Sequence, residues 1–309
     1  MPLQVHLDTD LGGDIDDLCA LALLLRWPGV TVRGITTVAD GGGQRAAYTR
    51  YALRLAGRAD IPVAAGADAA LPYYREYPGL PDHNAYWPEP IPPTPGPLDA
   101  ALDMLAASIA AGALIITIGA LTNLRLLEER CPGLLARARL VTMGGHVFPV
   151  RAGFPQWGNP MDYNLQSDVS SAQLVFARAA PTLVPLSMTV ETYLRRAHLP
   201  RLQAAGPLGA LIARQAEACA VEYNNEAVHG AACAGLPDDL INWQHDALAV
   251  AVALGYRAGV ELRSFPLSVS VEAGLLVERL DPRGKRFPVV VRIDGESFSE
   301  FWLDTITKP

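Results

Sequence analysis

Hydrophobic positions along the chain alternate between short continuous apolar runs and longer stretches with helical spacing. The first run, LQVHL at residues 3–7, is typical of a strand, and Leu18, Leu21, Ala22 and Leu25 then recur at the spacing of a helix. Strand-like and helical stretches continue to alternate through VTVRGITTV (30–38), QRAAYTRYALRLAG (44–57), IPVAAG (61–66), ALDMLAASIAAG (101–112), ALIITIG (113–119), LTNLRLLEE (121–129) and ARLVTMGG (138–145). This order predicts an α/β fold with a mostly parallel central sheet flanked by helices.

Two regions depart from this alternation. Residues 72–97 are rich in proline and aromatic residues, which predicts a long surface loop, either an active-site lid or a rigid decoration. From about residue 260 onward, three short strand-like runs follow, with DPRGKR (281–286) as a hairpin candidate between the last two. We expect them to form a small C-terminal β appendage. Because no linker composition separates two halves, we predict a single domain over residues 1–309.

Composition and charge narrow the class of function. The net charge is −7 and there is no basic block, which argues against nucleic acid and anionic membrane surfaces as partners and favours a small neutral or metal-bridged substrate. The four cysteines lack CxxC spacing and are typical of reduced thiols. We expect no signal sequence, because the first acidic residue, Asp8, comes before an apolar signal segment could form, and no apolar run reaches membrane-spanning length. We therefore expect a soluble cytoplasmic protein.

The segment HLDTDLGGDIDDLCALALLL at residues 6–25 places five carboxylates within ten positions, namely Asp8, Asp10, Asp14, Asp16 and Asp17. Neighbouring carboxylates repel one another and raise one another's pKa, so such a group requires a cation or shared protons when it is buried. Helix capping explains Asp14 or Asp16 taken alone but not the whole group. The segment is neither an EF-hand nor a phosphate-binding loop, because a glycine replaces the expected ligand and carboxylates would repel phosphate.

Further polar residues follow the predicted strands, where ligands bind in open α/β sheets. They are Asp40, Thr122, Asn123, His146, Asn159, Asp162, Asn164, His245 and Asp246. This set is rich in oxygen and free of sulfur, which favours a hard divalent cation over zinc. Calcium fits it, and magnesium remains open. Two alternatives also remain: a structural cation site without catalysis, and helix caps at Asn123 and Asp246.

Seven motifs together resemble the nucleoside hydrolase family of the inosine-uridine type, whose members cleave the N-glycosidic bond of ribonucleosides. They are DTDLGGDIDD (8–17), GITTV (34–38), LAGRADIPVAAGAD (55–68), GALTNL (119–124), MGG (143–145), GNPMDYNLQSD (158–168) and HDALAV (245–250). The resemblance covers nearly the whole chain. The acidic motif is two residues longer than the usual DTDxGxDD, which makes Asp14 an additional carboxylate.

The resemblance implies a calcium-dependent hydrolase and assigns a role to individual residues. Asp10 would be the general base that deprotonates a calcium-bound water, and His245 would assist the departing base. Calcium would be held by Asp10, Asp17, the main-chain carbonyl of Thr122, and Asp246. The substrate would be bound by Asp16, Asp40, Met143, Asn159, Asp162, Asn164, His83, Trp87, Tyr223 and His229. A homodimer or homotetramer is implied as well.

Two rival functions follow from the same acidic segment. A phosphohydrolase of the haloacid dehalogenase type also begins with DxD, but it needs a lysine near the phosphate, and Lys285 and Lys308 lie beyond every motif. A non-catalytic protein that binds calcium and ribose would be expected to have lost the base, whereas Asp10 is present. The preferred nucleobase is left open, because base recognition lies in variable loops.

Overall fold

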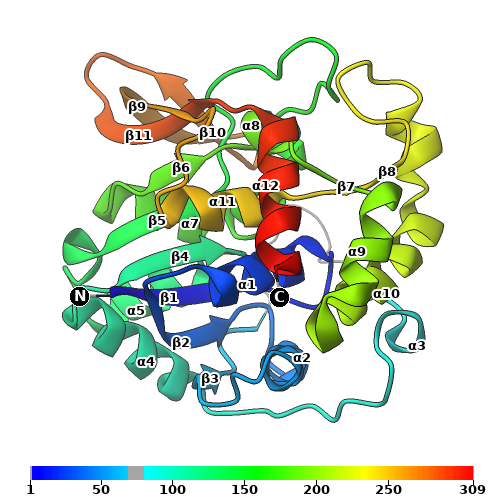
Figure 1. Ribbon diagram of the computed structural model, residues 1–309. Helices are drawn as coiled ribbons and strands as arrows, with labels where there is room; N and C mark the ends of the chain where they lie inside the picture. The colour runs from blue at the N-terminus through cyan, green and yellow to red at the C-terminus, as the bar shows by residue number, and fades with distance from the viewer. Residues whose placement is uncertain (1, 69–79, 309) are drawn as a thin grey trace.

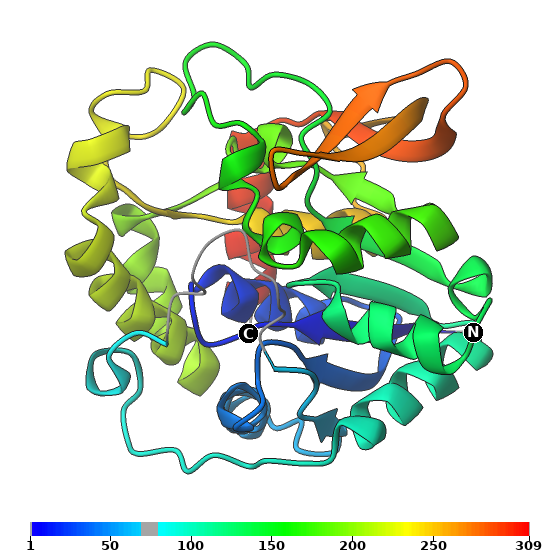
Figure 2. The same cartoon turned by 180° about the vertical axis from the view of Figure 1, so that it is seen from behind.

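The computed structural model describes residues 2–68 and 80–308, and one nine-stranded sheet runs through them in the order β10-β9-β11-β6-β5-β4-β1-β2-β3 (Figures 1 and 2). Seven strands that are consecutive in this order pair with their neighbours in parallel: β1 (Leu3–Thr9), β2 (Val30–Thr37), β3 (Val63–Ala64), β4 (Leu114–Ile118), β5 (Arg139–Met143), β6 (Thr182–Val184) and β11 (Lys285–Arg292). The predicted α/β fold with a mostly parallel sheet is confirmed.

Helices cover both faces of the sheet (Figures 1 and 2). One face carries α1 (Asp16–Arg26), α11 (His245–Ala253) and α12 (Gly295–Thr307), and the other carries α4 (Leu98–Ala110), α5 (Thr122–Arg130) and α7 (Val169–Arg178). The remaining segments include α2 (Gln44–Leu55), α6 (Tyr163–Ser167), α8 (Leu186–Thr189), α9 (Leu199–Ala204) and α10 (Gly206–Tyr223). Helix α11 is apolar on all sides because it lies between α1 and the strands β4 and β5.

The C-terminal strands extend the main sheet, but their order differs from the prediction. β9 (Glu261–Glu272) lies between β10 (Leu275–Leu280) and β11 and is antiparallel to both. The predicted hairpin at DPRGKR is therefore wrong, because the hairpin turn joins β9 to β10 instead. Leu267 of β9 pairs with Leu280 on one side and with Lys285 on the other, so the 281–286 segment crosses the end of β9.

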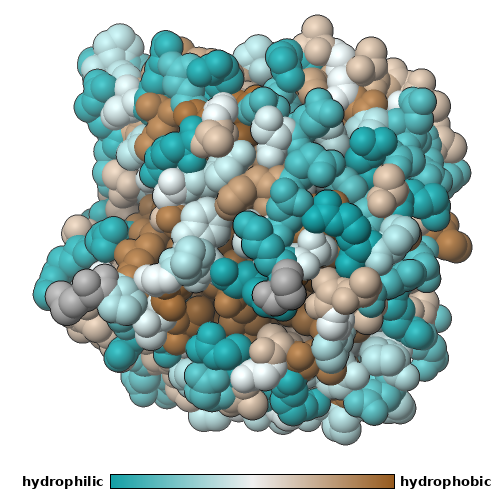
Figure 3. Space-filling view, viewed as in Figure 1, coloured by the Kyte–Doolittle hydropathy of each residue, from teal (hydrophilic) through white to brown (hydrophobic). Residues whose placement is uncertain are grey.

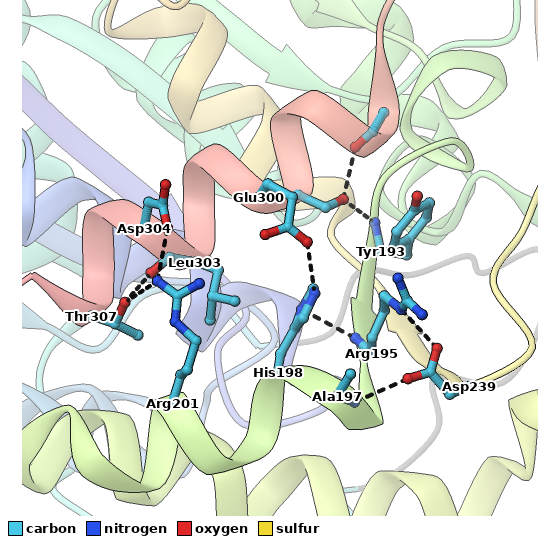
Figure 4. Close-up of polar contacts among 12 residues, drawn as sticks. Tyr193, Arg195, Ala197, His198, Arg201, Asp239, Glu300, Leu303, Asp304 and Thr307 are labelled. Atoms are coloured by element: carbon cyan, nitrogen blue, oxygen red, sulfur yellow. Dashed lines mark hydrogen bonds and ion pairs between the residues drawn. The ribbon is translucent and has the colours of Figure 1, made fainter.

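A second, two-stranded antiparallel sheet consists of β7 (Tyr193–Arg195) and β8 (Leu240–Trp243). Polar contacts tie this sheet and the turn before α9 to α12 (Figure 4): the backbone N–H of Tyr193 donates to Ser299 Oγ at 3.0 Å, and His198 Nε2 lies 3.5 Å from Glu300 Oε1. His198 is buried at this contact. The network matters for the site because β8 leads directly into α11.

The predicted loop at residues 72–97 lies partly outside the described residues. Within its described part, α3 (His83–Tyr86) forms a short helix, and Trp87 is only 2% exposed because it stacks on Tyr48 at a ring-centroid distance of 4.0 Å. This part of the loop is therefore packed against α2.

Hydrophobic side chains are more frequent on the left half of the face in Figure 3 than on its right half. None of the helices in the described ranges is long and apolar enough to cross a membrane.

Candidate active site

Three buried carboxylates meet where α1 and α11 begin. Asp16 and Asp17 open α1, Asp246 lies in the first turn of α11, and one carboxylate oxygen of each lies within 4.8 Å of the others. Both helices start at the carboxyl ends of the strands, so their N-terminal dipoles point toward this group. The structure thus brings together residues that are about 230 positions apart in the sequence, at the edge of the sheet where ligands were expected.

The electrostatics of this cluster are unfavourable in the absence of a cation. Burial first, and then the neighbouring carboxylates, raise the pKa of Asp16, Asp17 and Asp246 well above the usual value of an aspartate. Donors compensate Asp17 in part, because it accepts a hydrogen bond from Thr9 Oγ1 and lies near the Arg45 guanidinium. The effects that act on the pKa of Asp246 are burial and the charges of the neighbouring aspartates, and all of them raise it.

Asp10 completes the acidic group from the end of β1. Its negative charge contributes to the raised pKa of Asp16, Asp17 and Asp246, so it lies close to all three. Asp10 Oδ1 faces Gly119 at the exit of β4, where an added side-chain carbon would approach it to 2.8 Å. Arg45 of α2 donates a hydrogen bond through Nη1 to the main-chain carbonyl of Asp10. The base expected from the sequence is therefore held beside the carboxylate cluster.

Asp8, near the end of β1, is held by polar side chains from β2 and α5. Asp8 Oδ1 accepts hydrogen bonds from Thr36 Oγ1 at 2.5 Å and from Asn123 Nδ2 at 2.8 Å, and Thr36 also contacts His6 Nε2 at 3.0 Å. Burial raises the pKa of Asp8 to about 7. Asn123 additionally bonds to the backbone of Thr37, so it positions strand ends and does not cap α5.

The two-residue extension of the acidic loop carries Asp14, which lies near enough to the carboxylate cluster for its charge to raise the pKa of Asp16 and Asp246. Asp14 Oδ1 accepts hydrogen bonds from Asn242 Nδ2 of β8 and, at 2.5 Å, from the backbone N–H of Ile15. Gly12 has a φ of 113°, and a side-chain carbon there would lie 2.5 Å from the Tyr48 ring. The extension thus docks the loop onto β8 on one side and onto α2 on the other.

Residues of the GNPMDYN motif lie at the ends of β5 and β10. Asp162 is buried and accepts hydrogen bonds from the backbone N–H of Gly145 at 2.5 Å and of Leu165 at 3.2 Å. Asn164 Nδ2 contacts the carbonyl and the sulfur of Met143. Asn159 Nδ2 donates instead to Leu276 O of β10, so the C-terminal hairpin takes part in shaping this region.

Thr122 and Asp40 have their side chains engaged by the protein. Thr122 Oγ1 donates to Asp168 Oδ2 at 2.8 Å, which leaves the main-chain carbonyl as its group for a cation. The Asp40 carboxylate accepts hydrogen bonds from Thr37 Oγ1 and from the backbone N–H groups of Arg45 and Ala46. Asp40 therefore caps α2, and the structure supplies no support for a substrate contact by its carboxylate.

A group of aromatic rings adjoins the carboxylates at the end of β8. Trp243 lies 5.0 Å from His229 and 6.0 Å from His245 between ring centroids, and Trp157 lies 4.7 Å from Trp243. The sequence analysis singled out both histidines but missed the two tryptophans. The sequence contained a signal for them, since Trp157 directly precedes the GNPMDYN motif and Trp243 lies two residues before the HDALAV motif.

His245 stands between the aromatic rings and the carboxylates. It is half-buried, and withdrawal from water lowers its pKa to about 3, so the imidazole is neutral near pH 7. Its Nδ1 lies 2.7 Å from Thr189 Oγ1, and this hydroxyl also donates to Leu186 O at 3.3 Å. Because a hydroxyl carries one proton, Thr189 accepts from Nδ1–H, which leaves a lone pair on Nε2.

The other expected base contacts lie in different surroundings. His83 uses both ring nitrogens within the protein, toward Tyr48 Oη at 2.8 Å and toward Glu89 O at 2.9 Å. Trp87 belongs to the hydrophobic core around Tyr48. Tyr223 is 45% exposed at the end of α10, and burial together with the nearby Asp14 charge raises its pKa. Of these three, Tyr223 is therefore the residue with both exposure and proximity to the acidic loop.

A family model for inosine-uridine preferring nucleoside hydrolases matches residues 5–300. The chain belongs to this family. Nucleoside hydrolases cleave ribonucleosides into base and ribose, and the family resemblance drawn from the seven motifs is confirmed. Lys285 is not available for the lysine chemistry of a dehalogenase-type phosphohydrolase, because its ammonium group donates to the carbonyls of Phe176 and Ala179 at the end of α7.

Individual relatives agree with the family assignment. The pyrimidine-specific ribonucleoside hydrolase RihA of Salmonella arizonae is 32% identical over 230 residues, which are 69% of this chain and 70% of that protein. The probable uridine nucleosidase 2 of Oryza sativa subsp. japonica is 29% identical over 203 residues, 62% of this chain and 58% of that protein.

Solved structures share the fold over the full length. The plant nucleoside hydrolase PpNRh1 superimposes with a TM-score of 0.79 at 20% identity and covers 100% of both chains. The purine-preferring ribonucleoside hydrolase from Gardnerella vaginalis superimposes with a TM-score of 0.75 at 20% identity and covers 98% of both chains.

Proposed function

We propose that this protein hydrolyses the N-glycosidic bond of ribonucleosides at the carboxylate cluster, with Asp10 as the general base and a calcium ion as cofactor. The observation that carries the proposal is the convergence of Asp16, Asp17 and Asp246 within 4.8 Å, with the charge of Asp10 beside them. Family membership supplies the reaction class, and the geometry supports the assignment of residues to it.

The donor set fits a hard divalent cation. The cluster offers buried carboxylate oxygens and no sulfur or imidazole ligand, and the charges of its members raise one another's pKa. A cation would be held by Asp10, Asp17, Asp246 and the main-chain carbonyl of Thr122. When bound, a calcium ion supplies a positive charge that acidifies water and attracts the ribose diol. Magnesium prefers a smaller octahedral site, so a comparison of the two ions tests the choice.

The protein's own side chains account for the remaining chemistry. Asp10 would accept a proton from the attacking water, and Asp16, Asp162 and Asn164 would hold the ribose hydroxyls. Breaking the glycosidic bond builds positive charge on the sugar, and the surrounding carboxylates stabilise that charge in a buried setting. Arg45 would fix Asp10 through its main-chain carbonyl, since the hydrogen bond from Nη1 restrains the turn that carries the base.

The aromatic group at the end of β8 would receive the nucleobase. Trp157, Trp243 and His229 offer ring faces and edges on one side of the cluster, and bases of either class stack on such rings. His245 would assist the departing base, with the lone pair of Nε2 available for a hydrogen bond to it. Tyr223 at the end of α10 would border this base site.

A reducing-sugar assay on inosine, adenosine, guanosine, uridine and cytidine in the presence of calcium tests the proposal. We expect release of ribose from at least one nucleoside, and a loss of about 10³-fold or more in kcat for Asp10→Asn, because removal of a general base costs factors of this order. Asp60→Asn, at an exposed aspartate paired with Arg58, serves as the matched control and should leave kcat unchanged. Absence of hydrolysis of all five nucleosides would favour a calcium- and ribose-binding protein without catalysis.

Assembly and location follow as further parts of the proposal. We propose a homodimer or homotetramer, as the family resemblance implies, and light scattering of the purified protein decides between these states and a monomer. We also propose a cytoplasmic location, which the four free cysteines support. Cell fractionation with a tagged chain tests it.

A further inference from the structure

Glu278 is a buried carboxyl group that the hydrolytic chemistry does not use. It lies on β10, in the C-terminal hairpin, and is only 4% exposed. Its Oε2 accepts hydrogen bonds from the backbone N–H of His146 at 3.3 Å and from Asn159 Nδ2 at 3.2 Å. Its Oε1 is buried and has no hydrogen-bond partner in the described part of the chain. Ionisation of Glu278 would cost free energy, because Oε1 would carry negative charge without accepting a hydrogen bond.

Glu278 shares its surroundings with Asp162. Consecutive backbone amides at the exit of β5 are bound by the two carboxyl groups: Gly145 N–H by Asp162 at 2.5 Å, and His146 N–H by Glu278. Two acidic groups that hold adjacent amides lie close enough to repel when both are ionised, and one proton relieves that repulsion. The geometry therefore favours one neutral and one charged member.

The segments packed around Glu278 add no cation that would keep it ionised. Glu278 pairs with Val269 of β9. Glu272, a charged residue at the end of β9, forms an ion pair with Arg279 at 2.6 Å. The titratable side chains of the neighbouring segments are Asp162, Tyr163 and Asp168 at the ends of α6, Arg178 at the far end of α7, and the half-buried His146. Burial, and then the Asp162 charge, raise the pKa of Glu278 to about 8, in spite of the donors from His146 and Asn159.

We propose that Glu278 is a positioning residue of the nucleoside site, which as a neutral acid holds the turn after β5 and Asn159 in place around Asp162. The inference rests on the proposed function, because it assigns to Asp162 the binding of a ribose hydroxyl. The neutral acid supplies an acceptor for His146 N–H and Asn159 without adding a second negative charge beside Asp162. If Glu278 lost its proton, its negative charge would repel Asp162 and loosen the turn. Substrate binding would then weaken while the chemical step continued.

The test is the pH dependence of KM and kcat between pH 6 and 9.5 for the wild-type enzyme, Glu278→Gln and Glu278→Ala, with the best ribonucleoside. In the wild type we expect KM to rise about tenfold per pH unit once the acid has ionised, with kcat changing much less. Glu278→Gln, which mimics the neutral acid, should have a KM within about threefold of wild type at pH 7 and should lack the alkaline rise. Glu278→Ala removes the acceptor and should raise KM at every pH.

Glu272→Gln is the matched control on the adjacent strand, because Glu272 is exposed and paired with Arg279. It should retain the wild-type profile. An alkaline rise in KM that persists in Glu278→Gln, or a wild-type KM that is flat to pH 9.5, would overturn the role of Glu278 while leaving the proposed function intact. A wild-type protein that hydrolyses no nucleoside overturns both.

Thermal unfolding provides a readout that needs no activity. Between pH 5 and 9 the melting temperature of Glu278→Gln should gain on that of the wild type as the pH rises, because only the wild type must ionise a buried acid. Parallel curves for the two proteins would contradict a neutral Glu278 and overturn the inference.

Discussion

Substitution of Asp246 by asparagine should stabilise the protein in the absence of metal and abolish its stabilisation by calcium. The carboxylate oxygens of Asp16, Asp17 and Asp246 lie within 4.8 Å of one another, and two unit charges at that separation repel by about 3.5 kcal/mol at an effective dielectric constant of about 20. The amide that replaces the carboxylate would keep the shape of the side chain and remove its charge. Because protonation already relieves part of the repulsion, we expect a gain of about 1–3 kcal/mol at pH 8.

Urea denaturation at pH 8, in EDTA and in calcium, measures both halves of this prediction. The wild type should gain about 2.7 kcal/mol when calcium is present at about 100 times its dissociation constant, whereas Asp246→Asn should gain nothing measurable. Asp40→Asn is the matched control, since the Asp40 carboxylate accepts three hydrogen bonds as the cap of α2. It should lose about 1 kcal/mol with and without calcium.

The reasoning would be refuted if Asp246→Asn were less stable than the wild type in EDTA. In that case Asp246 would contribute hydrogen bonds that outweigh the repulsion. An equal calcium effect on the two proteins would refute the assignment of Asp246 as a ligand.

Three further predictions concern the loop, the base site and the pH dependence of stability. Gly12→Ala should cost more stability than Gly29→Ala, because both have positive φ but only the former meets a side chain, the Tyr48 ring at 2.5 Å; equal losses in urea denaturation would contradict this. Trp157→Ala should raise KM for the preferred nucleoside by about 5- to 150-fold, because base stacking contributes about 1–3 kcal/mol, while Trp27→Phe, at a tryptophan that packs against Phe301, should leave KM unchanged. The metal-free protein should lose stability as the pH rises from 4 to 7, since the pKa of Asp8 increases from 3.8 to about 7 on folding and the native state holds a proton that the unfolded chain releases; Asp8→Asn should flatten that slope in denaturation experiments.

Local pattern was sufficient for most of the architecture. The apolar residues of β4 and the helical spacing of α1 each indicate a buried element, so the succession of strands and helices could be deduced without tertiary contacts. The order of the C-terminal strands in the sheet could not be deduced in this way. The 281–286 segment has turn composition in either arrangement, and only pairing with Leu267 on both edges decides that β9 lies between its neighbours.

The candidate site shows the same division. Motif order placed Asp10, Asp17 and Asp246 in one functional group, and the structure brings the two helix starts that carry Asp17 and Asp246 together. Side-chain roles within the motifs depended on partners far away in the sequence. Asp40 caps α2, and Asn159 is held by β10, because hydrogen bonding of buried polar groups is satisfied by whichever donors the fold supplies.

By itself, the sequence determined the family, the α/β succession and the acidic group, since each is encoded in contiguous residues. Only the tertiary structure decided which carboxylates converge, which aromatic rings adjoin them, and that Glu278 of the C-terminal hairpin lies beside Asp162. The physical reason is that burial and proximity set the charge and pairing of a side chain, and both are properties of contacts between segments that lie far apart along the chain.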